Sequence, residues 1–206
     1  MGVPSIVAER KRLEYIVDNC RFETAQQVTE LFEAYTHLIW KYKQVGRIYD
    51  FYYDGMMIHR EGGNDLIGVE KVVQDTLACL AAFPDMEFMF YDIHGTGNAE
   101  DGFRFGQAVY FKGTFTGISK YGIGYGAAFE PNECVDICEC LVKKVDGKWR
   151  VVEEWGDRST CAFERVLRQA RPFLNPAKSE TAGEAGIEPC PNSEPVEDDC
   201  ALQEEA

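Results

Sequence analysis

Apolar residues recur every three or four positions in the first part of the chain, and this period predicts amphipathic helices. The clearest stretch runs from Thr24 to about Lys43. Its apolar positions are Val28, Leu31, Phe32, Tyr35, Leu38, Ile39 and Tyr42. Thr24 followed by Gln27 is typical of a capping box, so we expect the helix to begin there. A shorter amphipathic piece around Leu13 precedes it.

The same period returns after Gly68, where apolar residues from Val69 to Ala81 trace one helical face. Pro84 ends this predicted helix because a residue before proline is pushed out of the α region. Between these two long helices, residues 45–53 are expected to form a short helix that packs on the first. Residues 56–59, MMIH, are expected to form a short strand.

The segment from Met86 to His94 leaves the proline corner as a predicted strand with apolar residues on both faces, the pattern of a strand that is buried on both sides. Strict alternation places one set of side chains on a single face: Met86, Phe88, Phe90, Asp92 and His94. One face of this strand is expected to pack on helices, and the other to line a cavity or a subunit contact.

Three more strands are predicted at residues 103–115, 126–145 and 149–157, and the Asp146-Gly147 pair is typical of a hairpin turn between the last two. A terminal helix is expected at 162–171. Helices followed by a run of antiparallel strands favour an α+β fold. Glycines within and between the strands permit bulges and strong curvature, so we expect a cone-shaped sheet, covered by the N-terminal helices, with a pocket inside.

The formal net charge of -14 disfavours nucleic acid and anionic membranes as partners. Much of this charge lies in residues 175–206, which hold nine acidic residues against Lys178 and few large apolar ones. We therefore expect three parts: an N-terminal helical extension at 1–23, an α+β domain at 24–174 and a disordered acidic tail at 175–206. The sequence has no apolar run long enough for a membrane span, and we expect a cytoplasmic protein.

Eight cysteines raise the question of a metal site or a disulfide, above all in the ECVDICEC segment. In a strand, Cys134 and Cys138 would lie roughly 13 Å apart, too far for one zinc ion without a bend. A disulfide between Cys138 and Cys140 would sit near the geometric limit of about 6.8 Å between Cα atoms. We therefore expect reduced cysteines that act as small buried hydrophobes, and no metal.

Several segments, in this order and spacing, resemble the nuclear transport factor 2-like superfamily, and within it the SnoaL-like polyketide cyclases and the ketosteroid isomerases. They are the strand and glycines at 54–63, Gly68, AAFPD at 81–85, GTFTG at 113–117 and DGKWRVVEEW at 146–155. The resemblance covers about residues 24–170. It implies a cone-shaped α+β domain, and it implies a homodimer that pairs through the outer face of the sheet.

The resemblance to ketosteroid isomerases also implies catalytic positions. Tyr35 falls at the tyrosine that donates to the enolate oxygen, Asp136 falls at the oxyanion-binding acid, and His59 replaces the aspartate that moves the proton. In SnoaL-like cyclases an acid/base aspartate follows the tryptophan of the final strand, and Asp157 is its nearest counterpart. A histidine titrates near neutrality, as a general base should, and an aspartic acid that is kept neutral in an apolar site can donate to an oxyanion.

Many aromatic residues lie in segments that border the predicted cone, and they favour a flat, apolar substrate. The expected pocket residues are Trp40, Phe51, Tyr91, His94, Tyr110 and Trp155. No nucleotide-binding pattern is present, and no cofactor is expected. The sequence thus predicts a cofactor-independent isomerase, cyclase, dehydratase or lyase that acts on a hydrophobic cyclic or aromatic carbonyl compound. The alternatives are a non-catalytic module of the same fold that binds a small ligand, and a dimeric scaffold, because fold alone does not settle function.

Overall fold

The computed structural model describes residues 3–60, 63 and 65–172. Its first two elements are the helices α1, Val3–Asp18, and α2, Ala25–Trp40. Thr24 caps α2, because its side-chain oxygen accepts a hydrogen bond of 3.2 Å from the backbone N–H of Gln27. The Gln27 side chain reaches back to the N–H of Glu23, at 3.0 Å. The predicted start of this helix is confirmed.

The remaining helices are short or amphipathic. A 3-10 turn, η1 at Val45–Arg47, leads into α3 at Ile48–Phe51, which confirms the short helix predicted between residues 45 and 53. Helix α4 spans Val69–Ala82 and ends before Pro84, as the sequence predicts. Helix α5 spans Thr160–Leu167, slightly earlier than predicted.

The main sheet has six strands in the order β2-β1-β10-β9-β4-β3. Their bounds are β1 Tyr52–Arg60, β2 Leu66–Ile67, β3 Glu87–Asn98, β4 Gly102–Lys112, β9 Val135–Val145 and β10 Lys148–Arg158. The sheet is mixed rather than purely antiparallel, because β1 runs parallel to β10. The Asp146-Gly147 hairpin between β9 and β10 is present, with both residues at positive φ.

Two small strand pairs lie outside the main sheet. They are β5 Thr114–Phe115 with β8 Ala127–Ala128, and β6 Ile118–Ser119 with β7 Gly122–Ile123. The long strand predicted at 126–145 is therefore wrong in its first part. Residues 131–133, beginning at Pro131, form a turn, and β9 starts only at Val135.

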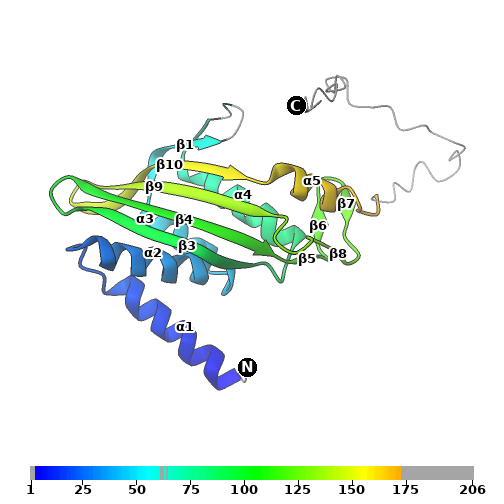
Figure 1. Ribbon diagram of the computed structural model, residues 1–206, viewed down its shortest axis with the longest axis horizontal. Coiled ribbons are helices and arrows are strands. Elements are labelled where there is room, and N and C mark those ends of the chain that lie inside the picture. The colour runs from blue at the N-terminus through cyan, green and yellow to red at the C-terminus, as the bar shows by residue number, and fades with distance from the viewer. Residues whose placement is uncertain (1–2, 61–62, 64, 173–206) are drawn as a thin grey trace, which may run out of the picture. The chain divides into compact units, whose positions relative to one another are not determined.

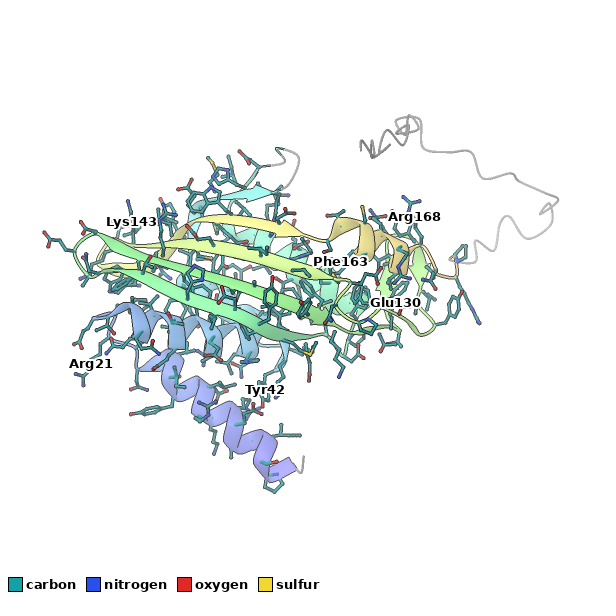
Figure 2. The ribbon with its side chains drawn as sticks, viewed as in Figure 1. Arg21, Tyr42, Glu130, Lys143, Phe163 and Arg168 are labelled. Carbon is teal, nitrogen blue, oxygen red and sulfur yellow. The ribbon has the colours of Figure 1, made fainter. Side chains whose placement is uncertain are left out.

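The helices and the inner face of the sheet enclose the core. Helix α2 lies against β3 and β4, α1 packs on α2, and α4 contacts β1 (Figure 1). Side chains fill the space between the layers (Figure 2), and Tyr42, labelled there, links the turn after α2 to α1 by donating to Glu9 Oε2 at 2.6 Å. Phe83, Phe103, Phe105 and Phe115 are fully buried and dominate this core.

Strand β9 presents the face that the sequence predicts. Asp136, Cys138, Cys140 and Val142 alternate with exposed or half-buried residues, and all four are buried. The expectation that the cysteines of this strand act as buried hydrophobes agrees with their burial, and Cys134, Cys138 and Cys140 are free.

Two β-bulges change which side chains face the interior. The register of β10 against β9 shifts between Val151 and Glu153, so Glu154 rather than Trp155 points inward. The register of β3 against β4 shifts between Phe90 and Asp92. His94 consequently leaves the face of Phe88, and the predicted single face from Met86 to His94 is wrong beyond the bulge.

The predicted acidic tail lies outside the described residues, and the domain limits proposed from the sequence stay predictions. Among the described residues, no helix has the length and apolar character needed to cross a membrane.

Candidate functional site

A small cavity of about 70 Å³ lies between the inner face of the sheet and helices α2 and α4. Its lining residues are Tyr35, Thr36, Ile39, Trp40, Ile48, Tyr52, Arg60, Val72, Asp75, Thr76, Phe88, Gln107, Asp136, Cys138, Glu154 and Arg158. Five of these side chains are of charged residue types, so the cavity is not the apolar pocket that the many aromatic residues in the sequence favour. Its volume suits a few water molecules or the polar end of a ligand.

Glu154 on β10 is one of two buried carboxylates of this cavity, with 5% of the residue exposed. Its Oε2 accepts a hydrogen bond of 2.8 Å from the hydroxyl of Tyr52, and its Oε1 lies 3.5 Å from Nη2 of Arg60. Burial raises the pKa of the Glu154 carboxyl, although Arg60 and Tyr52 both favour the charged form. Such a carboxyl keeps its proton to a higher pH than an ordinary glutamate does.

A second buried carboxylate, Asp136, is tied to Arg158. The Arg158 Nε donates to Asp136 Oδ2 at 2.8 Å, and its Nη1 donates to Asp75 Oδ2 at 3.1 Å. Burial alone lowers the pKa of the Arg158 guanidinium, but the negative charge of Asp136 and its neighbours raises it overall. Arg158 is therefore a fixed cation at the cavity wall.

Arg60 is held more loosely than Arg158. Its Nη2 lies 3.5 Å from Glu154 and 3.9 Å from Asp75, both longer than an ordinary hydrogen bond. Gly156 leaves the room that this guanidinium occupies, because a Cβ added there would lie 2.6 Å from Arg60 Nη1. A substrate oxygen can therefore compete for the Arg60 donors.

An apolar groove of about 460 Å³ adjoins the cavity between α4, α5 and the β6–β7 pair. Its apolar lining includes Ala78, Ala82, Phe83, Ile118, Phe163 and Leu167. The groove and the cavity share two wall residues, Asp75 and Arg158. Phe163, labelled in Figure 2, comes from α5.

Three residues that the sequence singles out line the cavity: Tyr35, Trp40 and Asp136. The Tyr35 hydroxyl donates to the backbone carbonyl of Arg47 at 3.1 Å. Burial raises the pKa of Tyr35 well above its usual value. Phe51 packs edge-on against the Tyr35 ring, with 5.3 Å between the ring centroids, as part of the core behind the cavity.

His59 lies on the outer face of the sheet, away from the cavity. Its Nδ1 is 3.1 Å from Asp65 Oδ1, its Nε2 is 2.9 Å from Glu153 Oε1, and its ring stacks on Trp155. The hydrogen bond with Glu153 raises the pKa of the imidazole. The structure therefore does not bring His59 together with Tyr35 and Asp136.

The other predicted residues also lie outside the cavity. Asp157 is exposed on β10, and His94 is exposed over Gly106, where a Cβ would lie 2.5 Å from the imidazole. Tyr91 and Tyr110 contact each other, with 4.8 Å between their ring centroids. Because of the bulge in β10, Trp155 shares the outer face with His59.

Sequence reasoning missed Glu154, Arg60 and Arg158. A weak signal for Glu154 is present in the apolar run VVEEW, where two adjacent carboxylates cannot both face water in a regular strand. A possible metal-ligating group was missed as well. Ligand atoms of Cys138, Cys140 and Glu154, all buried, lie within 4.8 Å of one another.

The chain is similar in fold to several solved structures. AclR of Streptomyces galilaeus, a provisionally assigned hydroxylase, has a TM-score of 0.50 at 16% identity, covering 82% of this chain and 87% of its own. IdmH of Streptomyces antibioticus, a provisionally assigned polyketide cyclase, has a TM-score of 0.49 at 19% identity, covering 64% and 91%. A SnoaL-like polyketide cyclase from Agrobacterium tumefaciens has a TM-score of 0.48 at 14% identity, covering 70% and 98%.

The similarity to AclR supports a shared α+β fold, in agreement with the fold class predicted from the sequence. No known family profile matches the sequence. No curated protein sequence matches it either.

Proposed function

We propose that this protein is an acid–base enzyme that moves a proton on a small carbonyl compound, with Glu154 as the proton carrier. The observation that carries the proposal is the buried Glu154 carboxyl at the wall of the cavity, with its pKa raised by burial and its Oε2 held by Tyr52. Catalytic carboxyls are commonly tuned upward in this way, because a base works best when its pKa lies near the working pH.

Proton abstraction next to a carbonyl also needs a group that stabilises the developing oxyanion. In this proposal Arg60 has that role, because its loose contacts with Glu154 and Asp75 leave its donors open to a substrate oxygen. Asp136 accepts a hydrogen bond from Arg158 and holds it in place, and the Tyr35 ring forms part of the wall. The fitting reactions are isomerisation, cyclisation, dehydration or elimination.

The two hollows suit the two ends of such a substrate. The cavity of about 70 Å³ accepts only a carbonyl group and its nearest atoms. The adjoining groove of about 460 Å³ falls within the range of roughly 300–1,000 Å³ typical of small-molecule sites. We infer that a hydrophobic ring system lies in the groove and that its carbonyl end reaches past Asp75 and Arg158 toward Glu154.

A proton-exchange assay tests this function without knowledge of the natural substrate. A panel of cyclic and aromatic ketones is incubated with the protein in D₂O, and loss of the proton next to the carbonyl is followed by ¹H NMR. We expect Glu154→Gln to slow the exchange by about 10²- to 10⁴-fold, the contribution of a general base. Glu153→Gln is the matched control, because Glu153 precedes Glu154 but bonds His59 on the outer face.

Two outcomes separate this proposal from its rivals. Loss of exchange in His59→Ala with activity kept in Glu154→Gln would contradict it and restore the histidine as base. Ketones that bind, with saturable NMR shifts, but exchange no proton in the wild type would favour a non-catalytic ligand-binding module. The apolar groove of about 460 Å³ is the observation that favours this second function, since a hollow of that size can hold a small ligand without turnover.

We also propose that two copies pair through the outer face of the main sheet. Large apolar side chains are exposed on this face, among them Met57, Met89, Tyr91 and Ile137. An exposed apolar patch on a sheet is typical of a protein contact. Light scattering should give the mass of a dimer for the wild type and of a monomer for Ile137→Glu, and a monomeric wild type would contradict the proposal.

A further inference from the structure

We infer that Cys138, Cys140 and Glu154 form a binding site for a thiophilic divalent metal such as Zn²⁺. The two cysteines alternate along β9 and point to the same side, where Glu154 of the neighbouring strand β10 meets them. All three residues are buried, and their ligand atoms lie within 4.8 Å of one another.

The sulfur atoms already have the spacing that a tetrahedral metal requires. Cys138 Sγ and Cys140 Sγ are 3.7 Å apart. Two sulfur ligands at about 2.3 Å from a tetrahedral zinc lie about 3.8 Å from each other. A disulfide fits less well, because residues two apart in a strand separate their Cα atoms by about 6.6 Å, close to the upper limit for that bond.

Glu154 is placed to complete a three-ligand set. Its Oε2 lies 4.0 Å from Cys140 Sγ, and a small shift of the carboxylate would bring it to the spacing of about 3.6 Å expected between sulfur and oxygen ligands of one zinc. Tyr52 donates to the same oxygen, and Arg60 lies beside the other. Such outer contacts orient a ligating carboxylate and tune its affinity.

The surroundings favour a bound cation with one open position. Cys138 and Glu154 line the cavity, so a fourth coordination position faces it, as in zinc sites that bind water or a ligand. Three carboxylates (Asp75, Asp136 and Glu154) face two guanidinium groups (Arg60 and Arg158) there. The additional negative charge of two thiolates would be balanced by a divalent ion.

Metal binding and proton binding compete at this site. Without a metal, the hydrogen bond with Cys140 and burial raise the pKa of the Cys138 thiol well above its usual value, so the thiol keeps its proton. Binding of one Zn²⁺ releases the protons of both thiols, and that of Glu154 where it is protonated, to the solvent. The inference rests on geometry and not on the proposed function, and its test uses no substrate.

Titration of the reduced full-length protein with Co²⁺ tests the site directly, because thiolate-to-cobalt charge transfer absorbs in the near ultraviolet. We expect one Co²⁺ per chain, with an absorption that added Zn²⁺ removes. Cys138→Ser, Cys140→Ser and Glu154→Gln should each weaken binding by more than about 100-fold, and Tyr52→Phe by about 10-fold, the scale for an outer-shell partner. Circular dichroism checks that each variant is folded.

The control variants are Cys161→Ser and the double variant Cys190→Ser/Cys200→Ser, which should keep the absorption unchanged. Cys161 is an exposed cysteine on α5, and the other two lie outside the described residues. Absence of charge-transfer absorption in the wild type would overturn the inference without recourse to any variant. The inference would also be overturned if the absorption survived Cys138→Ser and Cys140→Ser but was lost in Cys190→Ser/Cys200→Ser. A protein mass showing that Cys138 and Cys140 had both been oxidised would overturn it as well.

Discussion

The two faces of the sheet, at the paired ends of β1 and β10, carry similar residues in opposite settings. On the outer face His59 lies between Asp65 and Glu153 and stacks on Trp155. On the inner face, one position further along each strand, Arg60 and Glu154 face the cavity. Each face thus pairs a basic side chain with a carboxylate. The difference lies in burial.

Burial changes what such a pair can do. The outer histidine and its carboxylates exchange with water and are screened by salt, so their interaction contributes little. The inner carboxyl is almost fully buried, and its charged form is disfavoured unless Arg60 or a ligand compensates it. A group of this kind responds strongly to a substrate, a metal ion or a mutation. Histidine has the more suitable ordinary pKa for a general base, yet it is Glu154, and not His59, that lies at the cavity.

The largest expected effect comes from breaking the ion pair between Asp136 and Arg158. Asp136→Asn leaves the half-buried Arg158 without its closest carboxylate, and we expect the free energy of unfolding to fall by about 3 kcal/mol, the scale of removing one partner of a buried ion pair. Urea unfolding at neutral pH measures it. Asp157→Asn is the matched control, an exposed aspartate on the neighbouring strand β10, and we expect a change within about 0.5 kcal/mol. Equal effects from the two variants would remove the contrast between the faces.

A smaller effect, on activity rather than stability, is expected from Gly156→Ala. The new Cβ would lie 2.6 Å from Arg60 Nη1, so the guanidinium must move away from the cavity. Because only the end of a flexible side chain shifts, we expect a stability loss below about 1 kcal/mol. Ketone exchange should slow by about 10- to 100-fold, the effect of misplacing a catalytic group by roughly 1 Å. Gly46→Ala, with no atom within 4 Å of the added Cβ, should change neither quantity.

The smallest effect is expected from His59→Ala. The folded-state pKa of His59 is raised by Glu153, so its contribution to stability is present below the ordinary value of 6.5 and is lost as pH rises through the raised value. The wild type should therefore exceed the variant in stability at pH 6 and match it at pH 9. A stability difference that grows with pH would show that the imidazole is not stabilised by its carboxylate partners.

The sequence predicted the fold well because the fold depends on patterns that span many residues. Each of three patterns predicts one kind of structure: a helix from the 3.6-residue period of Val28 to Ile39, a helix end at Pro84, and a hairpin turn at Asp146-Gly147. The buried face of β9, from Asp136 to Val142, followed from simple alternation, because that strand runs without a bulge between these residues.

The site was harder to predict because single residues decide it. The bulges near Val152 and Tyr91 each displace one residue, which turned Trp155 and His94 outward. In β1 the apolar run Met56–Met57–Ile58 shows no alternation of apolar and polar residues, so the sequence did not determine on which face of the sheet His59 lies. The hydrogen bond between Tyr52 and Glu154 joins residues 102 positions apart in the chain, and the spacing of residues in a single sequence does not predict such a contact.

The proton affinity of Glu154 is the property on which the account depends most directly. We would measure it by ¹³C NMR of the glutamate side-chain carboxyl carbons as a function of pH, with the Glu154 signal assigned by its absence in Glu154→Gln. The account predicts a titration midpoint clearly above the ordinary 4.5, and a wild type that loses stability relative to Glu154→Gln as pH rises through that midpoint. A midpoint at or below 4.5 would mean that Glu154 is a permanently ionised structural carboxylate, and would contradict its role as proton carrier.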